Sequence, residues 1–397
     1  MKLSFCAIAK NEADNLPDCL NSVREVAEEL VVVDTGSTDG TPEIAEKLGA
    51  KVYEFPWCDD FAAARNASLK YVTGDWVLVL DADERLVPDI IPQIRRATGL
   101  EDHLLINLVR QEIGAVLSPY SLVSRLFRNH PDLYFSRPYH ALVDDSVAEI
   151  LRREPHWRIG SISEIAIAHE GYSADAIAGR NKRETAKTSM EKYLRQHPGD
   201  PYAASKLGAL YVEMGDMEGG IRLLKGGLEQ KSQIDPGILY ELHYHLGIAY
   251  RKKGFAKLAE RHYREAIAAE VLPQLKLGAY NNLGNLLKAK GDLAGARTAY
   301  ETAVNIDPNF GLGHNNLGMV LRAMGNSRGA IASYRRAIGL NPNYAEAYQN
   351  LGAALLGIGN LPESLDAFRK AIALYEKTNP AEGSRLRRGL SEMGLPI

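Results

Sequence analysis

Three short apolar segments near the start of the chain have the pattern of buried β-strands. They span residues 3–9, 30–33 and 76–80 and are rich in Val, Leu and Ile. Polar residues 10–16 open a helix after the first segment, and Pro42 opens another after the second. Strands that alternate with helices in this way predict a parallel, doubly wound α/β sheet.

Acidic residues follow two of these strands directly. Asp81 and Asp83 come after the segment 76–80, and Asp34 comes after the segment 30–33. Open α/β sheets bind ligands beyond the carboxyl ends of their strands. Two aspartates separated by one residue can share a divalent cation that bridges the oxygens of a diphosphate. Asp34 can accept a hydrogen bond from a base or a ribose, and the alternative is an ordinary capped turn between strand and helix.

Four ordered motifs make the assignment more specific, and they resemble the motifs of family 2 glycosyltransferases with the GT-A fold. The motifs occupy residues 8–12, 33–41, 60–66 and 81–84, and the resemblance extends to residues 125–128 and 167–172. It covers roughly residues 1–175. The resemblance implies an α/β GT-A-like domain with a Rossmann-like parallel or mixed sheet. Within the family, the chain looks most like the branch that carries tetratricopeptide repeats, which includes sublancin-type peptide S-glycosyltransferases and lipopolysaccharide-core transferases.

The resemblance also implies roles for individual residues. The expected contacts to a nucleotide-sugar donor, most simply a UDP-sugar, come from Ala9, Asn11, Glu12, Asp34, Arg65, Asp81 and Asp83. Asp83 and His169 would bind a metal ion, and Mn²⁺ or Mg²⁺ suits an oxygen-rich site with one imidazole. For His169 the alternative is a partly buried histidine whose hydrogen bonds are satisfied within the protein. Arg125 and Arg128 would meet phosphates or lie at the surface.

The chain departs from the family pattern in one place. A glutamate often follows the histidine after the Arg-Leu-Phe-Arg segment, whereas this chain has Ala141 after His140. An inverting transfer to a hydroxyl needs a general base. The candidates are His140, Asp144, Asp145 and Glu84. A cysteine acceptor needs less help, because a thiolate is accessible near neutral pH.

The second half of the chain is a repeat array. Leu283-Gly284, Leu317-Gly318 and Leu351-Gly352 recur every 34 residues, and aromatic residues and alanines recur with them. This is the tetratricopeptide pattern of two helices per unit. Two more divergent units precede these three, which predicts an all-α solenoid of about five units. The predicted domains are a transferase domain at 1–175, a linker helix at 176–200, repeats at 201–378 and a capping segment at 379–397.

Asparagines recur at one position of the first helix in three successive repeats. Asn282, Asn316 and Asn350 could form a ladder that binds the backbone of an extended acceptor peptide. The alternative is the ordinary asparagine of such repeats. In the linker, Arg180 and Lys182 would reach the donor phosphates or lie on a solvated helix face.

Composition sets further bounds. The chain has 397 residues, a formal net charge of −3 and only three cysteines. This charge argues against a general nucleic-acid binder, and the cysteines are too few for a disulfide framework. No apolar run reaches the length of a membrane span, and a cytoplasmic location is expected. The sequence therefore predicts a glycosyltransferase that acts on a peptide or protein acceptor. A transferase for lipopolysaccharide-core or lipid-linked glycans and an inactive, repeat-based scaffold are the alternatives.

Overall fold

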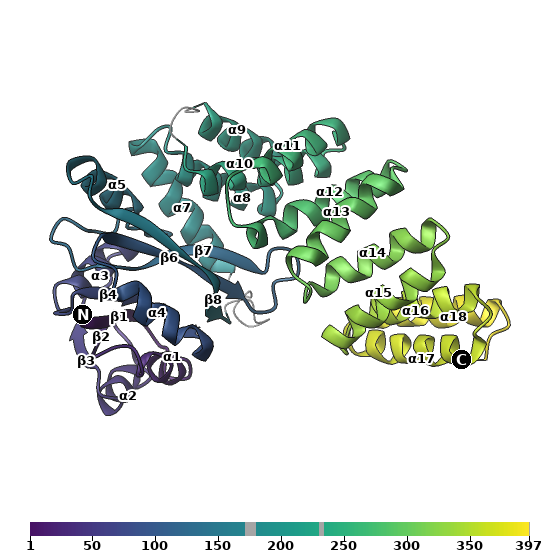
Figure 1. Cartoon of the computed structure of the whole chain (residues 1–397), viewed down its shortest axis with the longest axis horizontal. Coiled ribbons are helices and arrows are strands. Elements are labelled where there is room, and N and C mark those ends of the chain that lie inside the picture. The colour runs from purple at the N-terminus through teal and green to yellow at the C-terminus, as the bar shows by residue number, and fades with distance from the viewer. Residues whose placement is uncertain (171–179, 230–233, 397) are drawn as a thin grey trace. The chain divides into compact units, whose positions relative to one another are not determined.

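The computed structural model describes residues 1–170, 180–229 and 234–396, with the side chains of residues 180–182 excepted. The chain divides into two compact units, Met1–Leu210 and Tyr211–Ile397. Each unit is described by itself below (Figure 1).

The first unit is built on a mixed eight-stranded sheet. The strand order is β3-β2-β1-β4-β7-β6-β8-β5. The strands are β1 (Leu3–Ala9), β2 (Glu29–Asp34), β3 (Lys51–Glu54), β4 (Trp76–Val79), β5 (Glu84–Leu86), β6 (His103–Glu112), β7 (Tyr120–Arg128) and β8 (Arg158–His169). The first four in the spatial order are parallel, as the sequence predicts. The β4–β7, β6–β7 and β5–β8 pairs are antiparallel, and β6 and β8 run parallel.

Helices cover both faces of this sheet (Figure 1). They are α1 (Leu16–Val23), α2 (Thr41–Lys47), α3 (Phe61–Leu69), the 3₁₀ turn η1 (Pro88–Ile90), α4 (Ile91–Thr98) and α5 (Asp144–Arg153). Two further helices follow along the chain, α7 (Arg180–Gln196) and α8 (Pro201–Met214), and the boundary between the two units falls within α8. Successive residues of a strand point to opposite faces of the sheet and pack in two different hydrophobic cores. Leu78 packs in the core that includes α1 and α4, whereas Val77 packs in the core that includes α3 and α5. Strands that are buried on both faces explain the continuous apolar runs in the sequence.

The second unit consists of helices in successive pairs. They are α9 (Met217–Leu228), α10 (Pro236–Lys252), α11 (Ala256–Ala268), the turn η2 (Pro273–Lys276), α12 (Leu277–Ala289), α13 (Leu293–Ile306), α14 (Gly311–Ala323), α15 (Ser327–Leu340), α16 (Ala345–Gly357), α17 (Leu361–Thr378) and α18 (Pro380–Glu392). The recurring glycine of each first helix faces the recurring aromatic ring of the second. A Cβ atom on Gly284 would lie 2.6 Å from the Tyr300 ring, and Gly318 has the same relation to Tyr334. The sequence pattern of small and aromatic positions is thus the helix contact of the repeats.

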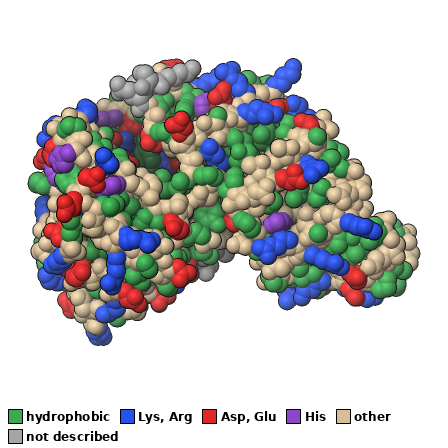
Figure 2. Space-filling view, in the orientation of Figure 1, with side chains coloured by type: hydrophobic (Ala, Val, Ile, Leu, Met, Phe, Trp, Pro, Cys, Tyr) green, Lys and Arg blue, Asp and Glu red, His purple; other side chains and the backbone are tan. Residues whose placement is uncertain are grey.

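The predicted domain boundaries stay untested. The boundary at residue 175 lies outside the described residues, and the other boundaries stay predictions. The cysteines Cys6, Cys19 and Cys58 are free thiols. Among the described helices, none combines the length and the apolar character that crossing a membrane requires. On the face shown in Figure 2, acidic and basic side chains are interspersed over the first unit.

Candidate active site

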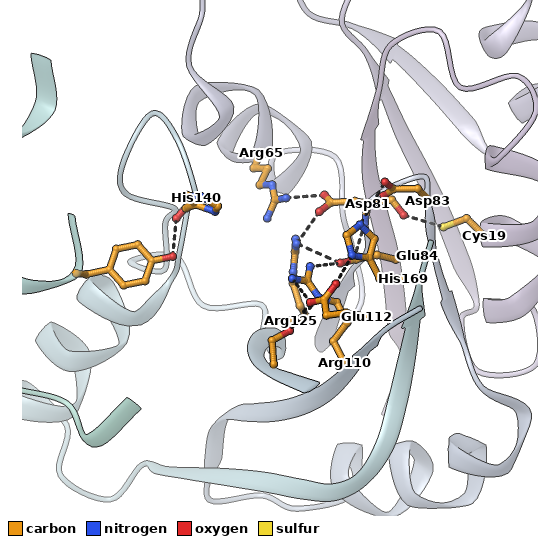
Figure 3. Close-up of polar contacts among 12 residues, drawn as sticks. Cys19, Arg65, Asp81, Asp83, Glu84, Arg110, Glu112, Arg125, His140 and His169 are labelled. Carbon is orange, nitrogen blue, oxygen red and sulfur yellow. Dashed lines mark hydrogen bonds and ion pairs between the residues drawn. The ribbon is translucent and has the colours of Figure 1, made fainter. Parts of the chain in front are cut away.

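Asp81 lies just beyond the carboxyl end of β4, and two arginines hold its carboxylate. Arg65 of α3 donates from Nη2 to Oδ1 at 2.5 Å, and Arg125 of β7 donates from Nη2 to Oδ2 at 2.7 Å. Figure 3 shows both guanidinium groups directed at the carboxylate of Asp81. Burial opposes ionisation of this carboxyl group, but Arg125 and Arg65 hold the pKa of Asp81 well below its usual range. Asp81 is therefore an anion that fixes two cations.

The buried carboxylate of Glu84 contacts the backbone of Asp81 and a third arginine, Arg110. Glu84 has no exposed surface. Its Oε2 atom accepts the backbone N–H of Asp81 at 2.8 Å, and its Oε1 atom accepts from Arg110 at 2.6 Å. A carboxylate that is enclosed and paired in this way has no room for an acceptor hydroxyl. The geometry therefore argues against Glu84 as the general base.

The two predicted metal residues, Asp83 and His169, are in contact with each other. His169, at the end of β8, places Nε2 3.3 Å from Oδ2 of Asp83. Its Nδ1 atom lies 2.6 Å from Oε2 of Glu112. Burial alone lowers the pKa of the imidazole, but the hydrogen bonds to Asp83 and Glu112 raise it to about 10. His169 thus lies beside Asp83 with a carboxylate partner on each ring nitrogen, and its role as a metal ligand stays a prediction.

Asp83 and His169 are the residues that would hold the predicted divalent cation. In the described residues, no group of three or more His, Cys, Asp or Glu side chains is arranged to hold a metal ion. Mg²⁺ and Mn²⁺ commonly bind through one or two protein ligands and take their remaining ligands from substrate phosphates and water. A carboxylate and an imidazole 3.3 Å apart match that kind of site.

Three buried polar atoms in this region have no hydrogen-bond partner among the described residues. They are Oδ1 of Asp34, Nε of Arg65 and Nη1 of Arg125. The other carboxylate oxygen of Asp34 accepts the backbone N–H groups of Gly36 and Ser37 at 2.9 and 3.0 Å. Buried polar groups are nearly always paired, so one unpaired acceptor and two unpaired donors point to a polar ligand.

The remaining predicted donor residues connect the loops beyond β1 and β2. The carbonyl of Ala9 accepts the N–H of Thr35 at 2.9 Å. Oδ1 of Asn11 accepts the N–H of Thr38 at 2.7 Å, and the N–H of Glu12 donates to Oγ1 of Thr41 at 2.9 Å. These contacts hold the two loops together next to Asp34.

Within residues 1–170, no hydrogen bond or ion pair of the structure joins the predicted bases His140 and Asp144 directly to Asp81. His140 has a left-handed φ of 53° on the loop between Ser136 and Leu142, and none of the contacts drawn in Figure 3 joins it to Asp81. Oδ1 of Asp144 accepts from the Ser124 hydroxyl at 3.0 Å. Their catalytic roles stay predictions.

The two arginines of the Arg-Leu-Phe-Arg segment have different surroundings. Arg125 belongs to the site, whereas Arg128 donates to the carbonyls of His103 and Leu100 and stacks on Trp76 at 4.6 Å. Arg128 thus packs at a partly exposed position, and a contact with phosphates stays a prediction. The side chains of Arg180 and Lys182 lie outside the described residues.

In the second unit, the recurring asparagines bond to one another between repeats. Asn316 donates to Asn281 at 2.8 Å, and Asn350 donates to Asn315 at 3.1 Å. Asn282 and Asn316 are only 4% and 6% exposed. Their role in an acceptor groove stays a prediction, and the structure leaves little of these two amides exposed to a peptide.

Sequence reasoning missed Arg110 and Glu112. Both point into the site from the end of β6, which no motif marks. Their spacing of two residues on a strand puts them on one face, but only the pairing of β6 with β8 brings that face to His169.

Comparison with known proteins defines the class. The glycosyl transferase family 2 profile matches residues 4–160, TPR repeat profiles match residues 284–325 and 318–359, and a tetratricopeptide repeat profile matches residues 345–382. The chain therefore contains an N-terminal glycosyl transferase family 2 domain followed by tetratricopeptide repeats, as its motifs predict.

Several known proteins are similar to this chain over different parts of its length. A TPR repeat-containing protein of Synechococcus elongatus is 43% identical over 307 residues, which cover 77% of this chain and 76% of the relative. An uncharacterized glycosyltransferase of Rickettsia bellii is 30% identical, over 45% of this chain and 63% of the relative. The SPbeta prophage-derived glycosyltransferase SunS of Bacillus subtilis is 26% identical, over 49% of this chain and 45% of the relative.

Proposed function

We propose that this chain transfers a sugar from a nucleotide-sugar donor, most simply a UDP-sugar, to a peptide or protein acceptor held by the repeats. The observation that carries the donor part is the set of three unpaired buried atoms on Asp34, Arg65 and Arg125. A nucleoside diphosphate offers an N–H or hydroxyl donor to Asp34 and anionic or carbonyl acceptors to the two arginines. The acceptor part rests on the repeats, which commonly bind proteins.

In this proposal Asp83 and His169 hold Mn²⁺ or Mg²⁺ against the diphosphate. A bound divalent cation neutralises the charge that develops on the departing diphosphate. Arg65 and Arg125 add fixed positive charge next to the same group, and Asp81 keeps both guanidinium groups in place. The proposed reaction therefore uses both a metal ion and a pair of preorganised guanidinium groups.

The acceptor proton goes to a separate base in the proposed reaction. His140, Asp144 and Asp145 are the candidates that we favour, because Glu84 is enclosed and paired. A thiol acceptor makes the weakest demand on this base. Inversion at the sugar is the outcome that the family resemblance implies.

The direct experiment measures nucleotide release by the purified chain. A panel of UDP-, GDP- and CDP-sugars with Mn²⁺ or Mg²⁺ is incubated with a peptide extract, and mass spectrometry identifies the modified acceptor. Modified peptides support the proposal. Transfer only to lipopolysaccharide-core or lipid-linked glycans assigns the alternative acceptor class. Nucleotide binding without turnover of any donor, with and without both acceptor classes, supports the scaffold instead.

The variant that tests the metal assignment is Asp83→Ala. Its side chain lies at the predicted metal position and is about a third exposed, so its loss has little effect on folding. The variant should lose metal-dependent turnover. Equal turnover in the variant and the wild type contradicts the metal assignment but leaves the donor assignment intact.

A further inference from the structure

Glu112 is buried at the edge of the site, and both of its carboxylate oxygens have hydrogen-bond partners. It is 6% exposed. Its Oε1 atom accepts from Nε of Arg110 at 2.9 Å and from the Ser121 hydroxyl at 2.7 Å. Its Oε2 atom is directed at Nδ1 of His169, 2.6 Å away. One oxygen of this carboxylate is thus held by β6 and β7, and the other holds the imidazole.

Strand pairing determines this geometry. β6 and β8 run parallel with Glu112 opposite His169, and the short strand β5 pairs with β8 on its other side with Glu84 opposite His169. His169 therefore lies between two strands, and its ring is fixed by backbone register as well as by hydrogen bonds. Glu112 contacts Nδ1, so Nε2 is the nitrogen that faces Asp83.

We propose that Glu112 is a positioning residue, which orients His169 so that Nε2 faces Asp83 and the cation that accompanies the donor. This inference rests on the proposed function. A histidine that binds a metal through one nitrogen usually donates its other N–H to a carboxylate, which fixes the tautomer and the ring orientation. The contact between Glu112 and His169 has that form, and Arg110 and Ser121 keep the carboxylate from turning away.

A purely structural role for Glu112 makes different predictions. Glu112 could serve only to pair Arg110, which also pairs with Glu84 at 2.6 Å. In that case its loss would change stability without changing the protonated nitrogen of His169 or the affinity for metal. The decisive readouts are therefore the tautomer and the metal affinity, rather than activity.

The first measurement is the affinity of the full-length chain for Mn²⁺ in the presence of UDP, by electron paramagnetic resonance. We expect Glu112→Ala to weaken Mn²⁺ binding by about 10- to 100-fold. Glu112→Gln keeps an oxygen that can accept from Nδ1, so it should weaken Mn²⁺ binding less than Glu112→Ala does. It also serves as the second variant if Glu112→Ala does not fold. Both variants should retain affinity for UDP alone.

The matched control is a second carboxylate–histidine pair at the other end of the same strand. Oδ1 of Asp102 lies 2.7 Å from Nδ1 of His103, at the start of β6. Asp102→Asn removes the charge from a pair of the same kind. We expect its Mn²⁺ affinity to stay within about twofold of the wild-type value, since a contact of that kind acts only on its own histidine.

The second measurement identifies the tautomer of His169 by ¹H–¹⁵N correlation spectroscopy of the diamagnetic Mg²⁺–UDP complex. The signal is assigned by its absence in His169→Asn. In the wild type, we expect the proton on Nδ1. In Glu112→Ala, the form with the proton on Nε2 should become populated.

The outcomes separate the two proposals. If the wild type binds Mn²⁺ and Glu112→Ala binds it equally well with an unchanged tautomer, the positioning role is wrong and the proposed function stands. If the wild type binds neither Mn²⁺ nor Mg²⁺ in the presence of UDP, the proposed metal dependence is wrong and the inference falls with it.

Discussion

The guanidinium group of Arg65 and the carboxylate of Asp81 form a close ion pair, with Nη2 and Oδ1 2.5 Å apart. Arg65 belongs to the helix that follows β3, and Asp81 follows β4. The pair therefore links two separate motifs of the family into one structural unit. Arg125 completes it from β7, at 2.7 Å from the other carboxylate oxygen. Asp81 and Asp83 thus have different surroundings although they stand two residues apart.

This difference predicts different effects for the two aspartates. Asp81→Ala leaves two cations that are about 90% buried without their shared anion, and such a loss costs about 3–5 kcal/mol. Asp83→Ala should change the stability of the first unit by less than about 1 kcal/mol, because Asp83 is partly exposed. Urea unfolding followed by tryptophan fluorescence measures both, since all three tryptophans lie within residues 1–210. Equal free energies of unfolding for the two variants would contradict the conclusion that Asp81 stabilises the first unit by pairing with Arg65 and Arg125.

The unpaired oxygen of Asp34 predicts selection among bases. Uracil carries a donor at N3, whereas cytosine carries an acceptor there, and a buried carboxylate oxygen rejects an acceptor. We expect UDP to bind the wild type at least tenfold more tightly than CDP. Asp34→Ala should bind UDP less tightly and reduce this ratio. Isothermal titration calorimetry with UDP and CDP measures it, and a ratio near one in the wild type would exclude base reading by Asp34.

The sequence predicted the parts of the site that local patterns mark. The apolar segments at 3–9 and 76–80 match β1 and β4 closely, because buried parallel strands need continuous apolar runs. Asp34 and Asp81 lie at the strand ends as expected. These features depend on the order of residues along the chain, and a single sequence contains that order.

The parts that the sequence did not show depend on contacts between distant residues. Glu112 meets His169 across 57 positions of the chain, and only the register of β6 and β8 makes them neighbours. The burial of Asn316 likewise follows from the packing of one repeat on the next, which places Asn281 within 2.8 Å. Residue spacing within one element gives no information on such pairs.

The loop that carries His140 is held by Arg137, whose φ is 72°. Arg137 donates to Asp145 at 2.6 Å and to Asp200 at 3.1 Å. Because a left-handed non-glycine residue needs such support, Arg137→Ala should release the loop. We expect amide hydrogen exchange within residues 136–142 to become at least tenfold faster, as measured by mass spectrometry.

The control for Arg137 is an arginine in an exposed ion pair of the same unit. Arg153 donates to Asp132 at 2.8 Å, and both side chains are more than half exposed. Exposed pairs of this kind contribute little, so Arg153→Ala should leave exchange in residues 136–142 unchanged. If both variants exchange alike, Arg137 does not hold the loop.

Glu29 predicts how the stability of the first unit depends on pH. Burial alone raises the pKa of this carboxyl group, but hydrogen bonds from Ser4, Thr73 and Lys51 lower it to about 2. An unfolded glutamate titrates near pH 4.3. The stabilisation is therefore fully present above about pH 5 and is lost as the pH falls toward 2. Glu29→Gln should lower the free energy of unfolding at pH 7 by about 2 kcal/mol and flatten its fall below pH 5. Tryptophan-monitored urea unfolding between pH 3 and pH 7 tests both effects.

The repeats predict opposite effects for two glycines in neighbouring helices. A methyl group on Gly318 of α14 would lie 2.6 Å from the Tyr334 ring, so Gly318→Ala should destabilise its repeat by about 1–3 kcal/mol. Gly339 of α15 has no atom within 4 Å of such a methyl group, and Gly339→Ala should stabilise the helix by about 0.5–1 kcal/mol. Hydrogen exchange of peptides from α14 and α15 reports both changes locally, which matters because repeat arrays need not unfold in one step. The two substitutions add the same methyl group to the same residue type, so a shared direction of change would mean that backbone propensity rather than the glycine–aromatic contact dominates here.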